Sequence, residues 1–364
     1  MKLRDLRLLN YRNHKELYIK FNDGLNIICG RNSVGKTNIL EAIHLCLKGK
    51  SFKNSKDEEM INFDSQYSNV FLNLEIENTS EEISIDIKRG SRKSYKVNNE
   101  EIKLIRDLKN QYKCVIFEQD MLKIIKEGPK NRRDFVDNLI SDIRNDYSVI
   151  LKNYNKVLFI RNEILKFGNN KKYFKERLIS SNNQLISEGV KIIKKREEYA
   201  KKINTIANEV YKNINNNFEN LNFKYVPDIE VVNSDIKTLS LEFFNNLKET
   251  YNNDLKTKMT SKGPHKDDFL IEIDEKNSRI YSSAGQQRSA LLALKISELD
   301  IIRYYSDISP VLLLDDVFSE LDRGRIYCFL NYIKGLQSIL TIADDSQLKD
   351  ILKDKNIECN YIYL

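Results

Sequence analysis

The stretch LNIICGRNSVGKTNILEAI, residues 25–43, carries the strongest fold signal in the sequence. Its first five residues form a mostly apolar run bounded by Gly24 and Gly30, which is typical of a buried strand. The next eight residues, Gly30 to Thr37, fit the pattern G-x-x-x-x-G-K-[ST], and the apolar residues that follow recur at helical spacing up to Gly49. The sequence therefore predicts strand, glycine-rich loop and helix in that order, which is the arrangement of a phosphate-binding P-loop.

The chemistry of such a loop explains its residue types. Backbone N–H groups of the loop and of the helix start have no intrahelical partner, so they can bind an anion, which the helix dipole also favours. Lys36 is placed to reach the β- and γ-phosphates of a nucleotide, and Thr37 to hold Mg²⁺ through its hydroxyl. A plain glycine-rich turn is the alternative interpretation. The predicted nucleotide-contacting residues of the loop are Gly30, Arg31, Asn32, Ser33, Val34, Gly35, Lys36, Thr37 and Asn38.

A second motif, VLLLDDVFSELD at residues 311–322, supports the first. Its apolar run followed by two carboxylates describes a buried central strand with acidic side chains at the carboxyl end. We expect Asp315 beside the Mg²⁺ and Asp316 beside the attacking water, which makes Lys36, Asp315 and Asp316 the predicted catalytic residues. A strand that runs into an acidic turn is common by itself. Together the two motifs predict ATP and Mg²⁺ as cofactors.

A third motif, SSAGQQRSALLALK, begins at residue 282 and contains a Ser-x-Gly-Gln turn before a predicted helix over 284–306. Alone, Ser283 would be an ordinary helix N-cap. The order of P-loop, Ser-x-Gly-Gln turn, acidic strand and SELD turn resembles the ATPase heads of ABC type. This resemblance implies that Ser283, Gly285 and Gln286 contact the γ-phosphate of a nucleotide held by a second subunit. It also implies that residues 319–322 cross the dimer interface.

The other segments predict the rest of the architecture. Residues 3–21 and 69–102 show short alternating segments, the latter an antiparallel meander, and residues 267–275 and 278–285 look like a strand pair. Long charged segments over about 130–215 predict helices with too few heptads for a long coiled coil. With the resemblance, we expect an α/β ABC-type P-loop ATPase head, with mixed and parallel sheet, and a mostly helical second lobe. The predicted domains are a head of residues 1–105 plus 262–364 and an inserted lobe of residues 106–261.

Five stretches carry a narrower resemblance. In order they are residues 25–43, KEGPKNRRDFVDNLI (126–140), TSKGPHKDDFLIEI (260–273), SSAGQQRSALLALKISEL (282–299) and VLLLDDVFSELD (311–322). They resemble the RecF family of bacterial recombination mediators, and GPHKDD at 263–268 is the most family-specific block. The segment near 140–215 and the far C-terminus match that family mainly in character.

The RecF resemblance implies a weak, DNA-stimulated ATPase that forms an ATP-dependent homodimer and binds double-stranded and gapped DNA. With its partners RecR and RecO, such a protein helps to load RecA at gaps coated by single-strand binding protein. The implied processes are recombinational DNA repair, replication at stalled forks and the SOS response to DNA damage. The implied location is the nucleoid in the cytoplasm.

Several positions depart from the family pattern. Ser33 stands where glycine is usual, which we expect to be tolerated if its φ is negative. Lys266 replaces the usual arginine and loses a bidentate fork. VIFEQD (115–120) lacks the usual proline, so Gln119 is either a Q-loop residue near Mg²⁺ and water or a surface glutamine. LTIADDS (340–346) has no switch histidine, so no γ-phosphate sensor is assigned.

DNA contacts are predicted only as two basic groups. Lysines and arginines near Gly128-Pro129 and on the helical lobe could neutralise phosphates, or could be solvated helix faces. The pair Arg132 and Arg133 could instead organise the lobe interface. The two groups are Lys126, Lys130, Arg132 and Arg133, and Lys194, Lys195, Arg196, Lys201 and Lys202.

Composition limits the competing classes. The chain has 364 residues, 41% hydrophobic and 31% charged, with a formal net charge of +7, which permits an acidic partner. No apolar run is long enough to cross a membrane, and the N-terminus lacks a secretory apolar segment, so we expect a cytoplasmic protein. Five scattered cysteines without metal-ligand spacing predict reduced thiols.

The alternatives are other ATPase heads. One is an SMC/Rad50-like or OLD-like head in DNA metabolism, but an SMC-type protein needs a far longer coiled coil and an OLD-like nuclease needs a further carboxylate cluster. Another is an ABC transporter subunit docked on a membrane domain. The GPHKDD block and the lobe between P-loop and Ser-x-Gly-Gln turn argue against the transporter.

Overall fold

The computed structural model describes residues 1–102, 108, 111–167, 172–215, 218–230, 235–344 and 346–364. They form two compact units: a head unit of Met1–Met121 and Glu298–Leu364, and a second unit of Leu122–Ser297. This division differs from the predicted domain boundaries. Strand β8 (Cys114–Phe117) pairs with β12 (Val311–Asp315) of the head unit, and β10 (Asp268–Ile273) pairs with β9 (Leu221–Val226) of the second unit. Strand pairing, which sequence texture does not reveal, moves both boundaries.

The head unit contains a six-stranded antiparallel sheet in the order β2-β1-β4-β5-β6-β7. Buried and partly buried side chains alternate along β4, as expected for a sheet with one face on the core. The predicted meander over 69–102 is confirmed. The strands are β1 (Lys2–Tyr11), β2 (His14–Lys20), β4 (Tyr67–Ile76), β5 (Thr79–Lys88), β6 (Ser94–Val97) and β7 (Glu100–Glu101).

A second sheet of the head unit is parallel, in the order β14-β3-β13-β12-β8. Its remaining strands are β3 (Leu25–Cys29), β12 (Val311–Asp315), β13 (Ser338–Ile342) and β14 (Cys359–Tyr363). All residues of β3 and β13 are buried, which explains why both strands are mostly apolar. Strand β13 lies between β3 and β12, so the carboxyl ends of the two motif-bearing strands meet at one edge of this sheet.

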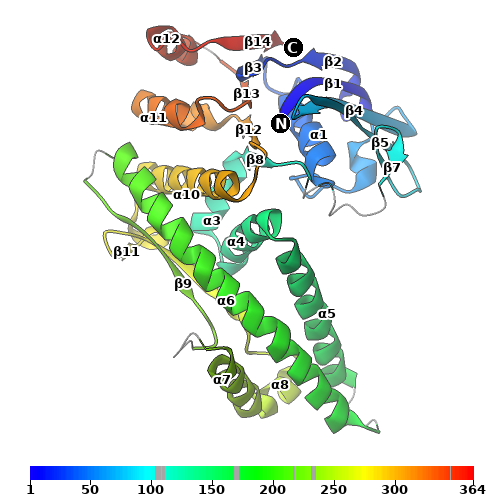
Figure 1. Ribbon diagram of the computed structural model, residues 1–364, viewed down its shortest axis with the longest axis vertical. Helices are drawn as coiled ribbons and strands as arrows, with labels where there is room; N and C mark the ends of the chain where they lie inside the picture. Colours follow the sequence, from blue (N-terminus) through cyan, green and yellow to red (C-terminus); the bar gives the residue numbers. More distant parts are fainter. Residues whose placement is uncertain (103–107, 109–110, 168–171, 216–217, 231–234, 345) are drawn as a thin grey trace. The chain divides into compact units, whose positions relative to one another are not determined.

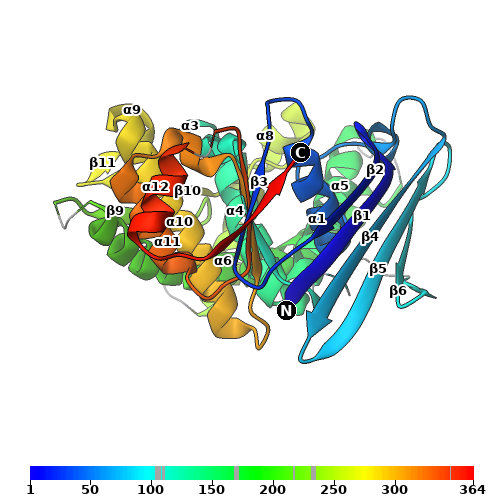
Figure 2. The ribbon, with the colours of Figure 1, turned by 90° about the horizontal axis from the view of Figure 1, so that it is seen from above.

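Helix α1 (Lys36–Lys48) lies between the two sheets (Figure 2). Every residue from Ile39 to Lys48 is buried, and one apolar core joins this helix to strands of both sheets. The helix ends at Gly49 as predicted, where a left-handed backbone (φ 72°) lets the Gly49 N–H reach the carbonyl of Leu45. The other short helices of the head are η1 (Asp57–Met60), η4 (Val317–Glu320), α11 (Arg323–Ile333) and α12 (Ser346–Asp354).

The second unit is mostly helical, as predicted. Its longest elements, α5 (Asn145–Phe167) and α6 (Phe174–Ile214), pack against each other as a hairpin (Figure 1). A three-stranded antiparallel sheet, β11-β10-β9, packs with α4 and α6. The remaining elements are α3 (Lys123–Lys126), α4 (Pro129–Ile143), β9 (Leu221–Val226), α7 (Ile236–Glu249), α8 (Tyr251–Thr257), η3 (Pro264–Lys266), β11 (Lys276–Asn277) and α9 (Ser278–Tyr281). Two elements, η2 (Gln119–Leu122) and α10 (Ala284–Tyr305), contain residues of both units.

The predicted strand over residues 278–285 is wrong. Strand pairing ends at Asn277, and Ser278–Tyr281 form the helical turn α9. The side chain of Asn277 accepts a hydrogen bond from the N–H of Arg279, which caps this turn. The alternation in SRIY therefore belongs to one capped helical turn rather than to a strand.

Candidate nucleotide-binding site

The P-loop joins β3 to α1 and depends on Gly35. This residue has φ 99°, a left-handed conformation that glycine adopts without strain. A Cβ atom there would lie 2.4 Å from Oδ1 of Asn13 and 2.4 Å from Nε2 of His14. The turn between β1 and β2 therefore packs directly against the loop, and no larger residue fits at position 35.

Ser33 also has a left-handed backbone, with φ 75°. The condition under which we expected serine to be tolerated, a negative φ, is therefore not met. For a residue with a Cβ atom this conformation costs about 1–2 kcal/mol. The loop holds its shape through its surroundings and not through the local preference of Ser33.

The ammonium group of Lys36 lies over the loop. Its Nζ donates hydrogen bonds to the carbonyls of Gly30 at 2.7 Å and Arg31 at 3.0 Å. Among the described residues it has no carboxylate partner. The positive charge is thus held at the loop by neutral acceptors, which leaves it available to a phosphate.

The two sequence motifs meet at Asp315. Its Oδ1 accepts a hydrogen bond from the Thr37 hydroxyl at 2.8 Å, across 278 residues of sequence. Asp315 ends β12, and Thr37 lies in the first turn of α1. A hydroxyl and a carboxylate side by side are hard oxygen ligands of the kind that Mg²⁺ prefers. The donor set therefore fits a nucleotide-bound Mg²⁺.

Sequence reasoning missed Thr341, which lies on β13 directly beside Asp315. The Thr341 hydroxyl donates to Asp315 Oδ1 at 2.8 Å and accepts from the backbone N–H of Asp316 at 3.1 Å. The side chain is 1% exposed. One hydroxyl therefore contacts the carboxylate of Asp315 and the backbone of Asp316, the two predicted catalytic residues of this strand end. The available signal was a hydroxyl inside the otherwise apolar strand SILTI, next to the central strand.

Asp316 adopts a left-handed backbone with φ 52°, directly after β12. A non-glycine residue in this region is uncommon, although aspartate and asparagine tolerate it better than most. The conformation lets the chain turn sharply into η4 at the carboxyl end of the sheet. The role of Asp316 toward an attacking water stays a prediction.

The turn before β2 contains further residues that sequence reasoning treated only as strand. Asn13 accepts a hydrogen bond from the side chain of Asn38 at 2.8 Å. Arg12 forms a bidentate pair with Glu41 of α1, at 2.9 and 2.7 Å. Burial disfavours the Glu41 carboxylate, but hydrogen bonds from Arg12 and Ser51 lower its pKa below the ordinary value. This ion pair anchors the turn to the helix that follows the P-loop.

Comparison with known proteins gives the family. A family model described as the RecF/RecN/SMC N terminal domain matches residues 2–357. The DNA replication and repair protein RecF of Acetivibrio thermocellus is 36% identical over 97% of this chain and 95% of its own length. That of Clostridioides difficile is 36% identical over 98% of this chain and 95% of its own. The chain belongs to the RecF family.

Solved structures agree. One described as "the recombination mediator protein RecF-ATP in RecFOR pathway" has 35% identity and a TM-score of 0.89 over 100% of this chain and 95% of that chain. Its RecF-ATPrS counterpart has 35% identity and a TM-score of 0.88 over 99% and 96%. An "SmcHead bound to the C-winged helix domain of ScpA" is 17% identical with a TM-score of 0.55 over 96% and 92%, a likeness of fold alone. The predicted ABC-type head fold is confirmed.

The RecF-type Ser-x-Gly-Gln turn forms the N-terminus of α10. The Ser283 hydroxyl accepts from the N–H of Gln286 at 3.2 Å, and Gln286 Oε1 accepts from the N–H of Ser283 at 2.8 Å. This reciprocal pair is a capping box. Gly285 lies within the first turn, and Gln286 also donates to Glu219 at 2.6 Å. Contact with a nucleotide of a second subunit stays a prediction for all three residues.

The structure describes only part of the two other segments that the RecF resemblance singles out, the one around Gln119 and the SELD turn at residues 319–322. The side chain of Gln119 lies outside the described part of the structure, and so does that of Glu320 in the SELD turn. Asp322, the last residue of that turn, caps α11 by accepting a hydrogen bond from the N–H of Arg325 at 3.0 Å. A role for residues 319–322 at a dimer interface stays a prediction.

The structure separates the basic residues that we considered for DNA contact. Arg132 is buried in a bidentate pair with Asp268, and Arg133 donates to the carbonyl of Asp267. Arg196 is 3% exposed and bonds Asp137 and Asp267. The interpretation of Arg132 and Arg196 as DNA contacts is therefore wrong, because internal carboxylates and carbonyls occupy their donors. For Arg133, which is half-buried, a DNA contact stays a prediction. Lys126 and Lys130 remain exposed, and Lys194 is partly exposed.

The described residues were also considered for metal-ligand clusters and for membrane-spanning helices. Within the described residues no group of three or more His, Cys, Asp or Glu side chains could hold a metal ion. No described helix has both the length and the apolar character needed to span a bilayer.

Proposed function

We propose that this chain is an ATP-dependent, DNA-binding recombination mediator. It binds ATP and Mg²⁺ at the P-loop, dimerises on ATP and binds double-stranded DNA near gaps. With RecR and RecO it helps to load RecA on strands coated by single-strand binding protein, at the nucleoid. The observation that carries the proposal is the junction of Thr37, Asp315 and Thr341, in a chain that belongs to the RecF family.

The chain's own residues supply the binding steps. The phosphates take the place of the Gly30 and Arg31 carbonyls as partners of the Lys36 ammonium, and the N–H groups at the start of α1 face the same anion. Thr37 and Asp315 are the residues that would hold Mg²⁺. When bound, Mg²⁺ would neutralise negative charge that develops on the phosphates. Asp316 orients the attacking water and accepts its proton.

In this proposal ATP hydrolysis is slow and is stimulated by DNA. It is slow because the nucleotide-binding site of one copy is completed only by residues of a second copy. Ser283 of one copy caps α10 and places N–H donors at an exposed helix start. These donors contact the γ-phosphate held by the P-loop of the other copy. Nucleotide state thereby controls dimerisation, and dimerisation controls residence on DNA.

The test measures size with and without ATP·Mg²⁺, by gel filtration with light scattering. Wild type should change from monomer to dimer only with ATP, and Ser283→Arg should stay monomeric while binding ATP as wild type does. A matched control is Ser282→Arg, one residue earlier and outside the capping box. ATP-dependent dimers of Ser283→Arg would overturn the composite site.

An SMC/Rad50-like or OLD-like head is the second candidate, and the structure gives it less support. Helix α5 ends at Phe167 and α6 begins at Phe174, so the hairpin closes after 23 and 41 residues of helix. An SMC-type arm needs many sustained heptads beyond this length.

A further inference from the structure

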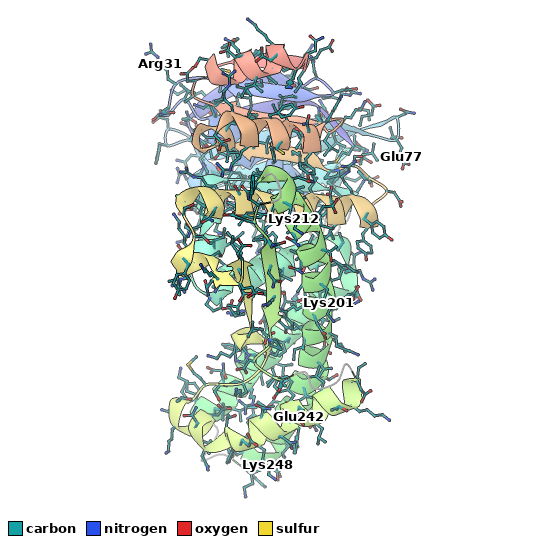
Figure 3. The ribbon with its side chains drawn as sticks, turned by 90° about the vertical axis from the view of Figure 1, so that its left-hand side faces the viewer. Arg31, Glu77, Lys201, Lys212, Glu242 and Lys248 are labelled. Atoms are coloured by element: carbon teal, nitrogen blue, oxygen red, sulfur yellow. The ribbon has the colours of Figure 1, made fainter. Side chains whose placement is uncertain are left out.

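The basic residues of the hairpin fall into two groups that differ in their partners. In the middle of α6 four lysines each pair with a glutamate of the same helix. The pairs are Lys191–Glu188 at 2.9 Å, Lys195–Glu198 at 2.9 Å, Lys201–Glu197 at 2.7 Å and Lys202–Glu198 at 2.6 Å. Figure 3 shows Lys201 on this part of the helix. We call these four lysines the paired group; three glutamates, one of them shared by Lys195 and Lys202, offset most of their charge, as is usual for a solvated helix face.

The second group lies where α5 ends and α6 begins, together with α8. We call it the basic end, and all of its side chains are exposed. None of them forms an ion pair with any described residue. Its members are Lys166, Lys172, Lys175, Arg177, Lys256 and Lys258.

The three segments of the basic end are held together by a small apolar cluster. Ile164 and Leu165 of α5 pack with Phe174 and Leu178 of α6, and Leu255 of α8 packs against them. Each basic residue is within three positions of one of these cluster residues in the sequence. The six basic residues therefore lie on three segments that one apolar contact holds together.

Less negative than positive charge lies at these helix ends. The carboxylates that reach solvent there are Glu163 of α5, Glu176 of α6 and Glu249 just before α8, and none of them forms an ion pair with a described residue of the basic end. Asp254 of α8 is fully buried and bonds Arg161 at 2.8 Å, so it contributes nothing outside. Six cations against three carboxylates leave an excess of positive charge, and an anionic partner relieves the repulsion within that excess.

Two exposed aromatic rings accompany the lysines. Lys166 Nζ lies 4.7 Å from the ring centroid of Phe167, and Lys172 Nζ lies 5.0 Å from that of Tyr173. The rings are 54% and 60% exposed. A cation over a ring keeps its charge and its N–H donors free for another anion, which an ion pair with glutamate does not. The contacts therefore leave the charge of both ammonium groups without a carboxylate partner among the described residues.

We propose that the basic end is a second-unit surface that binds the phosphate backbone of duplex DNA. The proposal rests on the DNA-binding function proposed above and gives it a location. Five of the six groups are lysines, point charges that suit phosphates without base readout, and together they match the dense, regular charge of a duplex. An acidic protein surface would explain the same charges, and the test separates the two.

The experiment compares two quadruple variants of the full chain. The first removes basic-end charge: Lys166→Gln, Lys175→Gln, Arg177→Gln and Lys256→Gln. The control removes the same charge from the paired group: Lys191→Gln, Lys195→Gln, Lys201→Gln and Lys202→Gln. Binding of labelled duplex DNA in ATP·Mg²⁺ is measured by anisotropy between about 50 and 200 mM salt. Circular dichroism and ATP binding check that both variants are folded.

The basic-end variant should bind duplex at least about tenfold more weakly, and its log–log salt slope should fall by about three to four. The control should stay within about threefold of wild type, because those lysines are already balanced by glutamates. Equal losses in both variants would mean that only net charge matters, and wild-type binding by the first variant would assign the surface to another partner. Either result overturns the proposal. If wild type itself does not bind duplex DNA, the proposed DNA-binding function is wrong, and this result is distinct from a failure of the basic end alone.

Discussion

The P-loop and the GPHKDD block are both dense in charged residues, but their charges are paired in opposite ways. At the P-loop, Lys36 bonds only carbonyls and Asp315 bonds only hydroxyls among the described residues. In the GPHKDD block, Asp267 bonds Arg196 at 2.8 Å, and Arg196 also holds Asp137 at 2.8 Å. The first arrangement leaves one charge of each sign for a ligand from solvent. The second neutralises itself and is structural.

The contacts and pKa shifts of the buried residues in the GPHKDD block support a structural role for this block. Asp267 is fully buried; burial raises its pKa, although Arg196 opposes the shift. His265 of the same block bonds Tyr154 at 2.7 Å, and burial lowers its pKa to about 4, so its imidazole is neutral near pH 7. Gly263 has φ 131°, and a Cβ there would lie 2.7 Å from the Tyr154 hydroxyl. The block therefore joins helices α5 and α6 through a packed polar core.

The largest expected effect breaks that core. Arg196→Met leaves Asp137 and Asp267 buried without their cation, so the free energy of unfolding should fall by about 3–5 kcal/mol. Urea unfolding measures it. The control is Lys201→Met on the same helix, whose exposed pair with Glu197 is worth less than about 0.5 kcal/mol. If both substitutions lowered the free energy of unfolding equally, the buried charges around the GPHKDD block would contribute no more to stability than an exposed pair, and the comparison would fail.

The next effect compares the same substitution, aspartate to asparagine, at the nucleotide site and in the GPHKDD block. Asp316→Asn keeps the shape and the tolerance for φ 52° but removes the base, so phosphate release should slow by about 10²-fold while ATP binding persists. Asp267→Asn should instead lower the free energy of unfolding.

The Asp316→Asn dimer should also leave labelled duplex more slowly than wild type after a competitor chase in ATP·Mg²⁺. Wild-type release from a variant confirmed not to hydrolyse ATP would separate hydrolysis from DNA residence.

Lys36→Met should weaken ATP binding by about tenfold to a hundredfold, since charged hydrogen bonds contribute about 1.5–3 kcal/mol. The free energy of unfolding should change little, because Lys36 bonds only loop carbonyls in the free protein. Titration with a fluorescent ATP analogue gives the affinity. Lys50→Met, just beyond the other end of α1, is the matched control. Unchanged affinity in Lys36→Met would remove the nucleotide site from this loop.

The sequence predicts those features that depend on neighbours along the chain. The P-loop, the buried strands before and after it, the end of α1 at Gly49 and the cap at Ser283 all follow from local spacing and local hydrogen bonds. Contacts set by strand order are different. Thr341 meets Asp315 because β13 pairs with β12 in one register, and Asn13 meets the loop because a distant turn packs there. No local pattern encodes either contact.

The unit boundaries and the buried arginines escaped prediction for the same reason. Arg132 and Arg196 look like surface charges in a lysine-rich sequence, and only tertiary folding brings Asp137, Asp267 and Asp268 to them. Spacing along the chain also could not show that the lysines of α6 differ from those at the hairpin end. Charge in the sequence indicates a function only once its partners are known.

The smallest expected effect tests whether Thr341 belongs to the site or to the core. Thr341→Val keeps the shape but removes the hydroxyl that donates to Asp315 and accepts from the N–H of Asp316. At about 1 kcal/mol for a hydrogen bond, the Mg²⁺ concentration that gives half-maximal binding of an ATP analogue should rise about fivefold. Thr341→Ser retains the hydroxyl and should restore the wild-type value. A residue that only fills the core would shift the melting temperature in both variants and leave the Mg²⁺ dependence unchanged. If valine and serine give the same Mg²⁺ dependence, the positioning of the two carboxylates does not depend on Thr341.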